Sequence, residues 1–135
     1  MKYLITIKDT HIIDGEKESS ELAITGSLRF NDKGYKIRYK EGDTGYDGCF
    51  VTLSVEGDKV TMTRLGAFSA EMIIEKGKRH ICAYATPAGI MNLGVYANRV
   101  SSEMTEDGGV LEFSYSLDVD GEYLSENHLV VTIQK

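Results

Sequence analysis

The sequence predicts an all-β protein, an antiparallel up-and-down β-barrel of about eight to ten strands. Short runs of alternating apolar and polar residues follow one another along the chain, and turns rich in Gly and Asp separate them. No segment has a convincing helical period. Closure into a barrel is favoured because it removes the open strand edges of a flat meander. A two-sheet β-sandwich is the alternative.

Length and composition indicate a single domain, residues 1–135, large enough to close one core without a metal or a disulfide. A net charge of −6 argues against nucleic acid as a partner, since that requires clustered Lys and Arg, although it leaves room for a small local basic patch. No run is long enough for a signal-peptide core or a membrane span. We therefore expect a cytoplasmic location without a membrane partner.

The alternating runs account for each expected strand in chain order. They cover residues 3–13, 22–30, 35–40, 51–55, 60–64, 68–74, 79–86, 90–98, 111–119 and 129–133. Gly26 interrupts the second run, which predicts a bulge or a bend of the barrel. The polar stretches at residues 16–20, 41–48 and 101–109 are interpreted as connections.

The middle of the chain, residues 79–100, predicts a central hairpin. Two strand-like runs flank the turn at residues 86–89, which begins with Thr86 and contains the single proline, Pro87, and the glycine Gly89. Both faces of this hairpin are partly apolar. The sequence therefore leaves open which face of its first strand points into the barrel.

Three short motifs in this order resemble the YwiB-like family of small bacterial proteins. They are TRLG at residues 63–66, YATPAG at residues 84–89 and FSYSL at residues 113–117. The resemblance covers most of the chain, from about Gly26 to Ile133. It implies a calycin-like, lipocalin-resembling barrel from a Gram-positive type of bacterium, with no established activity. The motifs mark Arg64, Gly66, Tyr84, Thr86, Gly89 and Tyr115.

Arg64 is the most informative single residue for function. It continues the face of Val60 and Met62, so a strand here would carry its charge toward the barrel interior. A buried charge must be compensated by a carboxylate, by carbonyl oxygens or by an anion. Two interpretations follow: a structural ion pair or stacking on a tyrosine, and an anchor for the anionic head group of a ligand.

We therefore expect a non-enzymatic barrel that binds a small anionic or amphipathic molecule in its interior. Apolar linings with a few convergent polar groups are typical of small-molecule sites. The expected ligand-binding residues are Arg64, Tyr84, Asn92, Tyr96 and Tyr115. The alternative is a protein-interaction or structural module with a filled core. The sequence leaves the oligomeric state and the ligand open.

No motif indicates catalysis, a cofactor or a metal. Phosphate-binding loops and nucleophile elbows are absent from the sequence, and its three histidines are scattered. Cys49 and Cys82 lie far apart and are interpreted as reduced core residues. His80 and Cys82 share one face of a strand, but acid-base or thiol chemistry would also need a third group to orient them, so both are interpreted as ordinary strand residues.

Overall fold

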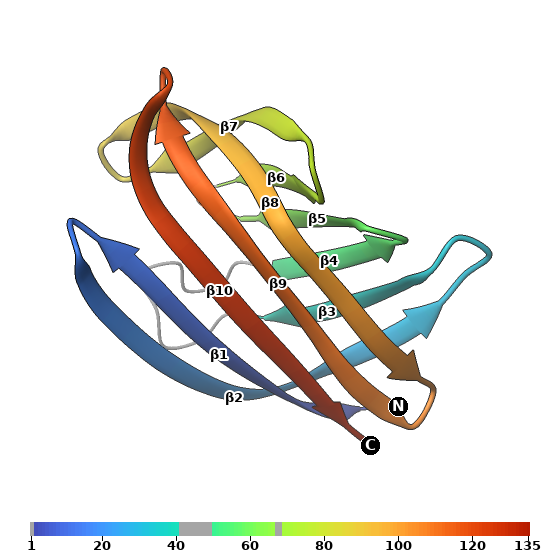
Figure 1. Cartoon of the computed structure of the whole chain (residues 1–135). Helices are drawn as coiled ribbons and strands as arrows, with labels where there is room; N and C mark the ends of the chain where they lie inside the picture. Colours follow the sequence, from blue (N-terminus) through green and yellow to red (C-terminus); the bar gives the residue numbers. More distant parts are fainter. Residues whose placement is uncertain (1, 41–49, 67–68) are drawn as a thin grey trace.

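The computed structural model describes residues 2–40, 50–66 and 69–135, with residues 84–86 described by their backbone alone. Ten antiparallel strands within these residues form a closed barrel, which confirms the predicted barrel and excludes the sandwich (Figure 1). The strands are β1 (Tyr3–Ile13), β2 (Glu16–Phe30), β3 (Tyr35–Lys40), β4 (Phe50–Glu56), β5 (Lys59–Leu65), β6 (Ala70–Glu75), β7 (Arg79–Thr86), β8 (Gly89–Thr105), β9 (Gly108–Val119) and β10 (Glu122–Gln134). In the same described residues, no helix is long and apolar enough to cross a membrane.

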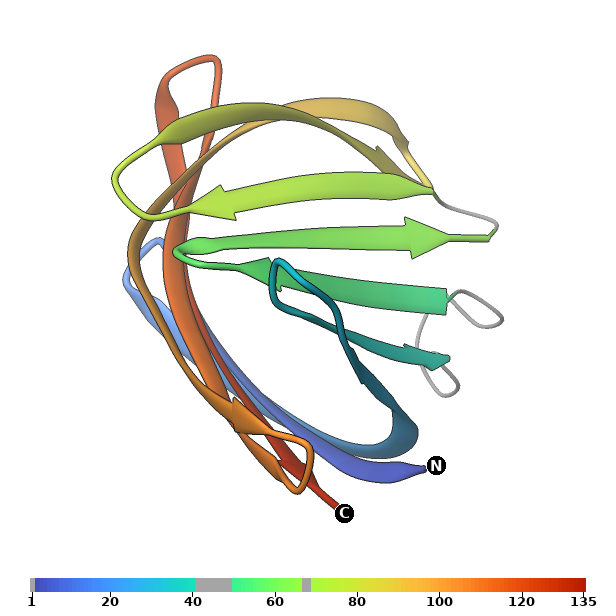
Figure 2. The ribbon, with the colours of Figure 1, turned by 90° about the vertical axis from the view of Figure 1, so that its right-hand side faces the viewer.

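Each strand pairs with the next one along the chain, and β1 also pairs with β10, which closes the barrel. The strands β3 to β7 are 6 to 8 residues long, whereas β1, β2 and β8 to β10 have 11 to 17 residues. Figure 2 shows the long strands curving around one side of the barrel and the short strands crossing the other. The two termini lie near each other at one end (Figures 1 and 2).

The core consists of the alternate side chains that point inward from the strands. Nine of them are fully inaccessible to solvent: Ile5, Ile37, Val60, Ile74, Val95, Ala97, Leu111, Phe113 and Val131. Two buried tyrosines complete the packing near the β8–β9 turn. The Tyr3 hydroxyl donates to the Glu106 carbonyl at 2.8 Å, and the hydroxyls of Tyr35 and Ser102 lie 2.5 Å apart. This end of the barrel interior is filled by side chains.

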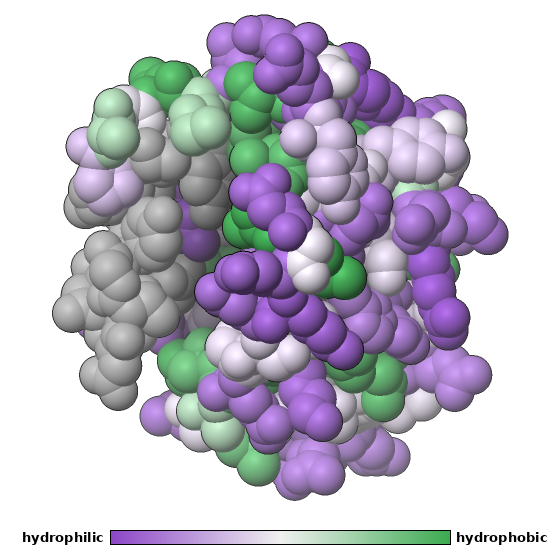
Figure 3. Space-filling view, turned by 60° about the vertical axis from the view of Figure 1, so that its left-hand side comes forward, coloured by the Kyte–Doolittle hydropathy of each residue, from purple (hydrophilic) through white to green (hydrophobic). Residues whose placement is uncertain are grey.

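Polar side chains occupy most of the outer surface. On the face shown in Figure 3, hydrophilic side chains predominate and hydrophobic ones form small separate groups. This distribution is the expected result of strands that present one face to the core and the other to water.

Two of the predicted connections are wrong. Residues 16–20 belong to β2 and pair with β1 up to the tight turn at Asp14 and Gly15, whose φ angles of 52° and 79° fit a type I′ hairpin. Residues 101–109 continue β8 and begin β9. Pairing in a hairpin satisfies the backbone hydrogen-bonding groups without an apolar face. The alternation of apolar and polar residues therefore does not identify these strand segments. The predicted loop at residues 41–48 lies outside the described residues.

The central hairpin is present as predicted. Strands β7 and β8 pair from Arg79 with Tyr96 to Thr86 with Gly89, and Pro87 occupies the turn between them. Gly89 has a φ of 124°, a conformation that L side chains rarely adopt, and Gly66 is similar at 145°.

The inward face of β7 is now determined. Cys82 is buried, whereas its neighbour Ile81 is 63% exposed. Because side chains alternate along a strand, His80 lies on the same inward face as Cys82.

The predicted bend at Gly26 is also explained by the pairing. Gly26 has register partners on both sides, Tyr3 in β1 and Tyr39 in β3. A Cβ atom at this position would overlap the carbonyl oxygen of Arg38 and the side chain of Ile5. The absence of a side chain therefore lets β2 pass from one neighbour to the other.

We expect the substitution Gly26→Ala to lower the free energy of unfolding by about 1–3 kcal/mol, because the added methyl group overpacks a backbone contact. Urea denaturation followed by circular dichroism measures the effect. The exposed neighbour Thr25→Ala is the control. Equal stability of the two variants would contradict the close approach of β3 at Gly26.

Candidate functional site

The inner surface of the barrel changes from apolar to polar on three neighbouring strands, at the same level on β1 and β2 and one inward position later on β10. The inward pairs on either side of this change are Ile7 and Asp9 in β1, Leu22 and Ser20 in β2, and Leu129 and Asn127 in β10. Asp9 lies opposite both Ser20 and Leu129 in the ladder, so these residues share one face of the sheet. The barrel therefore has a filled apolar part and a polar part.

A pocket of about 400 Å³ lies at this boundary. Its apolar lining includes Ile7, Leu22, Val51, Met62, Met72 and Leu129. Its polar lining includes Asp9, Ser20, Glu21, Tyr39, Arg64 and Tyr115. The structure therefore brings Arg64 and Tyr115 together in one pocket, beside the methionine that precedes Arg64 on its face of β5.

Asp9 is the acidic group of this pocket. Its carboxylate is partly withdrawn from water, with 40% of the side chain exposed, and burial raises its pKa above the ordinary value of 3.8. His11, whose Nδ1 is 3.9 Å from the carboxylate, opposes this shift. A cationic and an acidic side chain thus line the same small cavity.

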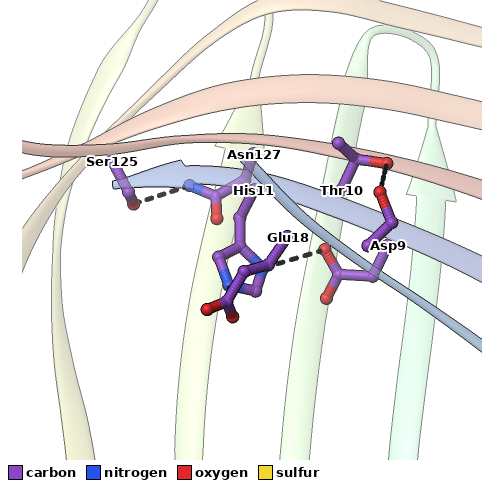
Figure 4. Close-up of polar contacts among 7 residues, drawn as sticks. Asp9, Thr10, His11, Glu18, Ser125 and Asn127 are labelled. Carbon is purple, nitrogen blue, oxygen red and sulfur yellow. Dashed lines mark hydrogen bonds and ion pairs between the residues drawn. The ribbon is translucent and has the colours of Figure 1, made fainter. Parts of the chain in front are cut away.

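The polar part of the interior continues beyond Asp9, as Figure 4 shows. His11 Nε2 lies 3.2 Å from Glu18 Oε2, and the Asn127 amide donates to the Ser125 hydroxyl at 3.0 Å. Thr10 points to the opposite side of β1. The buried Ser125 is only 3% exposed, so this hydrogen bond satisfies a polar group that water does not reach.

The interior placement expected for Asn92 and Tyr96 is wrong. Asn92 is exposed and Tyr96 is 42% exposed, whereas Leu93 and Val95 between them are buried. Both polar side chains therefore lie on the outer face of β8. The backbone of Tyr84 lies in β7 opposite Met91, and its side chain is outside what the structure describes.

His80 and Cys82 have local partners. His80 Nε2 is 2.9 Å from Glu75 Oε1, and this hydrogen bond is the main cause that lowers the pKa of Glu75. The Ile73 backbone N–H donates to the Cys82 sulfur at 3.4 Å. Within the described residues, no group of three or more His, Cys, Asp or Glu side chains is arranged to hold a metal ion.

Sequence reasoning missed Asp9, Ser20 and Asn127 as parts of the site. A signal for Asp9 was present, because it continues the period-two series of Ile5 and Ile7 without a change of phase. The other two are recognised only through the register of β2 and β10 against β1.

Comparison with known proteins supports the fold. A family model described as "Domain of unknown function (DUF1934)" matches residues 5–131. The crystal structure of the ywiB protein from Bacillus subtilis superposes with a TM-score of 0.85 at 19% sequence identity, covering 99% of this chain and 92% of that one. At this identity the match shows a shared fold. No curated protein matches the sequence.

The substitution Asp9→Asn tests the electrostatic cost of the partly buried carboxylate. Because the pKa of Asp9 is raised, the folded protein binds this proton more tightly than the unfolded chain does. The carboxylate therefore lowers stability as pH rises from below 3.8 through the raised pKa. We expect a higher Tm than wild type at neutral pH, and a gain that disappears as pH falls toward 3.8.

Thermal unfolding of both proteins across this pH range measures the difference in Tm. The matched control is Asp58→Asn, which removes an exposed carboxylate. A lower Tm of the Asp9→Asn variant at neutral pH would show that favourable contacts of the carboxylate outweigh its desolvation.

Proposed function

Because the chain belongs to the DUF1934 family, whose description assigns no function, we propose one from the geometry: the barrel binds a small amphipathic molecule with an anionic group. The observation that carries this proposal is the pocket of about 400 Å³, which combines an apolar wall with Arg64 and Asp9. Small-ligand sites typically occupy about 300–1,000 Å³ and have this mixture of groups.

The apolar wall suits the non-polar part of such a molecule. Met62 and Met72 are register partners on β5 and β6, and both line the pocket beside Leu22. Methionine side chains are flexible and polarisable, so this wall adapts to ligands of different shape. Burial of apolar ligand surface against this wall contributes to the affinity through the hydrophobic effect, which does not depend on orientation.

The polar wall selects the head group. The planar guanidinium of Arg64 matches the paired oxygens of a carboxylate, sulfonate or phosphate. Asp9 and Ser20, on the same wall, accept hydrogen bonds from a donor such as an amine or hydroxyl. A molecule with an anionic group, a nearby hydrogen-bond donor and an apolar body therefore matches both the apolar and the polar wall of the pocket.

The alternative, a structural or protein-interaction module, draws support from the filled part of the interior around Phe113 and the two buried tyrosines. It makes a different prediction, namely that the interior takes up no small molecule.

Fluorescence titration with two probes distinguishes these functions. The first is 8-anilinonaphthalene-1-sulfonate, an anionic amphipathic molecule, and the second is N-phenyl-1-naphthylamine, which has the same rings without the sulfonate. We expect saturable binding of both, with the sulfonate preferred. Arg64→Gln should weaken sulfonate binding by about tenfold, the effect of losing one hydrogen bond to a charged group, and leave the neutral probe unaffected.

Two further variants locate the binding. In Leu22→Trp, the larger side chain occupies the pocket that Leu22 lines, so this variant should bind neither probe. Arg99→Gln removes the same charge from an exposed position outside the pocket and should change neither. Absence of binding by wild type, or equal effects of Arg64→Gln and Arg99→Gln, would refute the interior site.

A further inference from the structure

The outer surface of β3, with the adjoining end of β2, concentrates positive charge in a protein whose net charge is −6. The segment of residues 29–40 contains one acidic residue, Asp32, against five cations. The cations of this surface, together with one aromatic residue, are Lys2, Arg29, Lys36, Arg38, Lys40 and Phe50, which we call the basic face.

The pairing of the strands brings these side chains together. Lys36, Arg38 and Lys40 occupy alternate positions of β3, so they point outward at intervals of about 6.5 Å. Arg29 of β2 lies directly opposite Lys36. All four side chains are exposed.

Within the described residues, no ion pair neutralises this charge. The structure gives none of the cations of the basic face a carboxylate partner among the described residues; these cations are Lys2, Arg29, Lys36, Arg38 and Lys40. Like charges directly opposite each other in a sheet, such as Arg29 and Lys36, destabilise the pairing. An external anion would remove this repulsion.

The basic face is grooved and carries an aromatic ring. One hollow of about 550 Å³ is lined by Lys2, Arg38, Lys40 and Phe50, and a second of about 380 Å³ by Arg29, Lys36 and Arg38. Arg38 lines both, so the two hollows are neighbours on the same surface. Phe50 is 40% exposed, and the Arg38 guanidinium carbon lies 4.9 Å from its ring centroid.

We propose that the basic face binds single-stranded nucleic acid. Regularly spaced cations along a strand suit a linear polyanion with a repeating charge, and an exposed ring beside them offers a stacking surface to an unpaired base. The expectation from net charge argued against nucleic acid, but the charge relevant to binding is local, and here it is positive.

Fluorescence anisotropy with labelled oligothymidylate and oligouridylate of about 12 nucleotides tests this proposal. We expect saturable binding that weakens steeply between about 50 and about 200 mM salt. Lys36→Glu combined with Arg38→Glu should weaken binding by at least about tenfold. Lys17→Glu combined with Lys76→Glu makes the same charge change elsewhere and should leave binding within about twofold of wild type.

The aromatic ring is tested separately. Phe50→Ala should weaken binding by about tenfold, the effect of losing one stacked base, whereas Phe50→Trp should retain it. Unlabelled inorganic polyphosphate and vesicles of phosphatidylglycerol are the competitors. The proposal is overturned if wild type does not bind, if the two double variants behave alike, if Phe50→Ala binds as wild type does, or if either competitor displaces the oligonucleotide as well as unlabelled oligonucleotide does.

Discussion

The alternation of side chains in a closed antiparallel barrel is the constraint on which the rest of the structure depends. Every strand has a neighbour on each side, so a shift of one residue in any ladder would turn a whole set of side chains from the core to the solvent. The position of Arg64 inside and of Arg38 outside follows from the same rule, applied to strands β5 and β3.

This constraint also explains why the barrel interior has an apolar part and a polar part. The inward series of β1 begins with apolar residues and continues with Asp9 and His11 in unchanged phase. Neither side chain can leave the inner face without breaking the register that buries Ile5. The desolvation that raises the pKa of Asp9 is therefore a consequence of strand geometry, and the protein retains it despite its cost.

The fold was predictable from sequence because alternation and turn residues are local signals. The turn at Pro87 was recognised from the residues that form it. Residues 16–20 were missed since a polar hairpin arm has no apolar period, and only its partner strand shows that it is paired. Strand length was thus less predictable than strand identity.

The candidate site was predictable in part. The period of β5 placed Arg64 toward the interior, where the pocket also includes Tyr115. Asn92 and Tyr96 were expected in the interior for their polarity and aromatic character, although they alternate with the apolar residues of β8 that form the core. The contributions of β2 and β10 required tertiary pairing, which a single sequence does not contain, whereas Asp9 of β1 continues the period-two series of its own strand.

The hairpin of β1 and β2 extends beyond the hydrophobic core, and this has a consequence for dynamics. Beyond Asp9 in β1 and before Leu22 in β2, the described side chains are exposed or only partly buried. Opening this tip breaks backbone hydrogen bonds but exposes little apolar surface, so it requires less free energy than global unfolding. Its amides should therefore exchange with solvent faster than those of the strands around Phe113, so the tip is a unit of local opening distinct from the core.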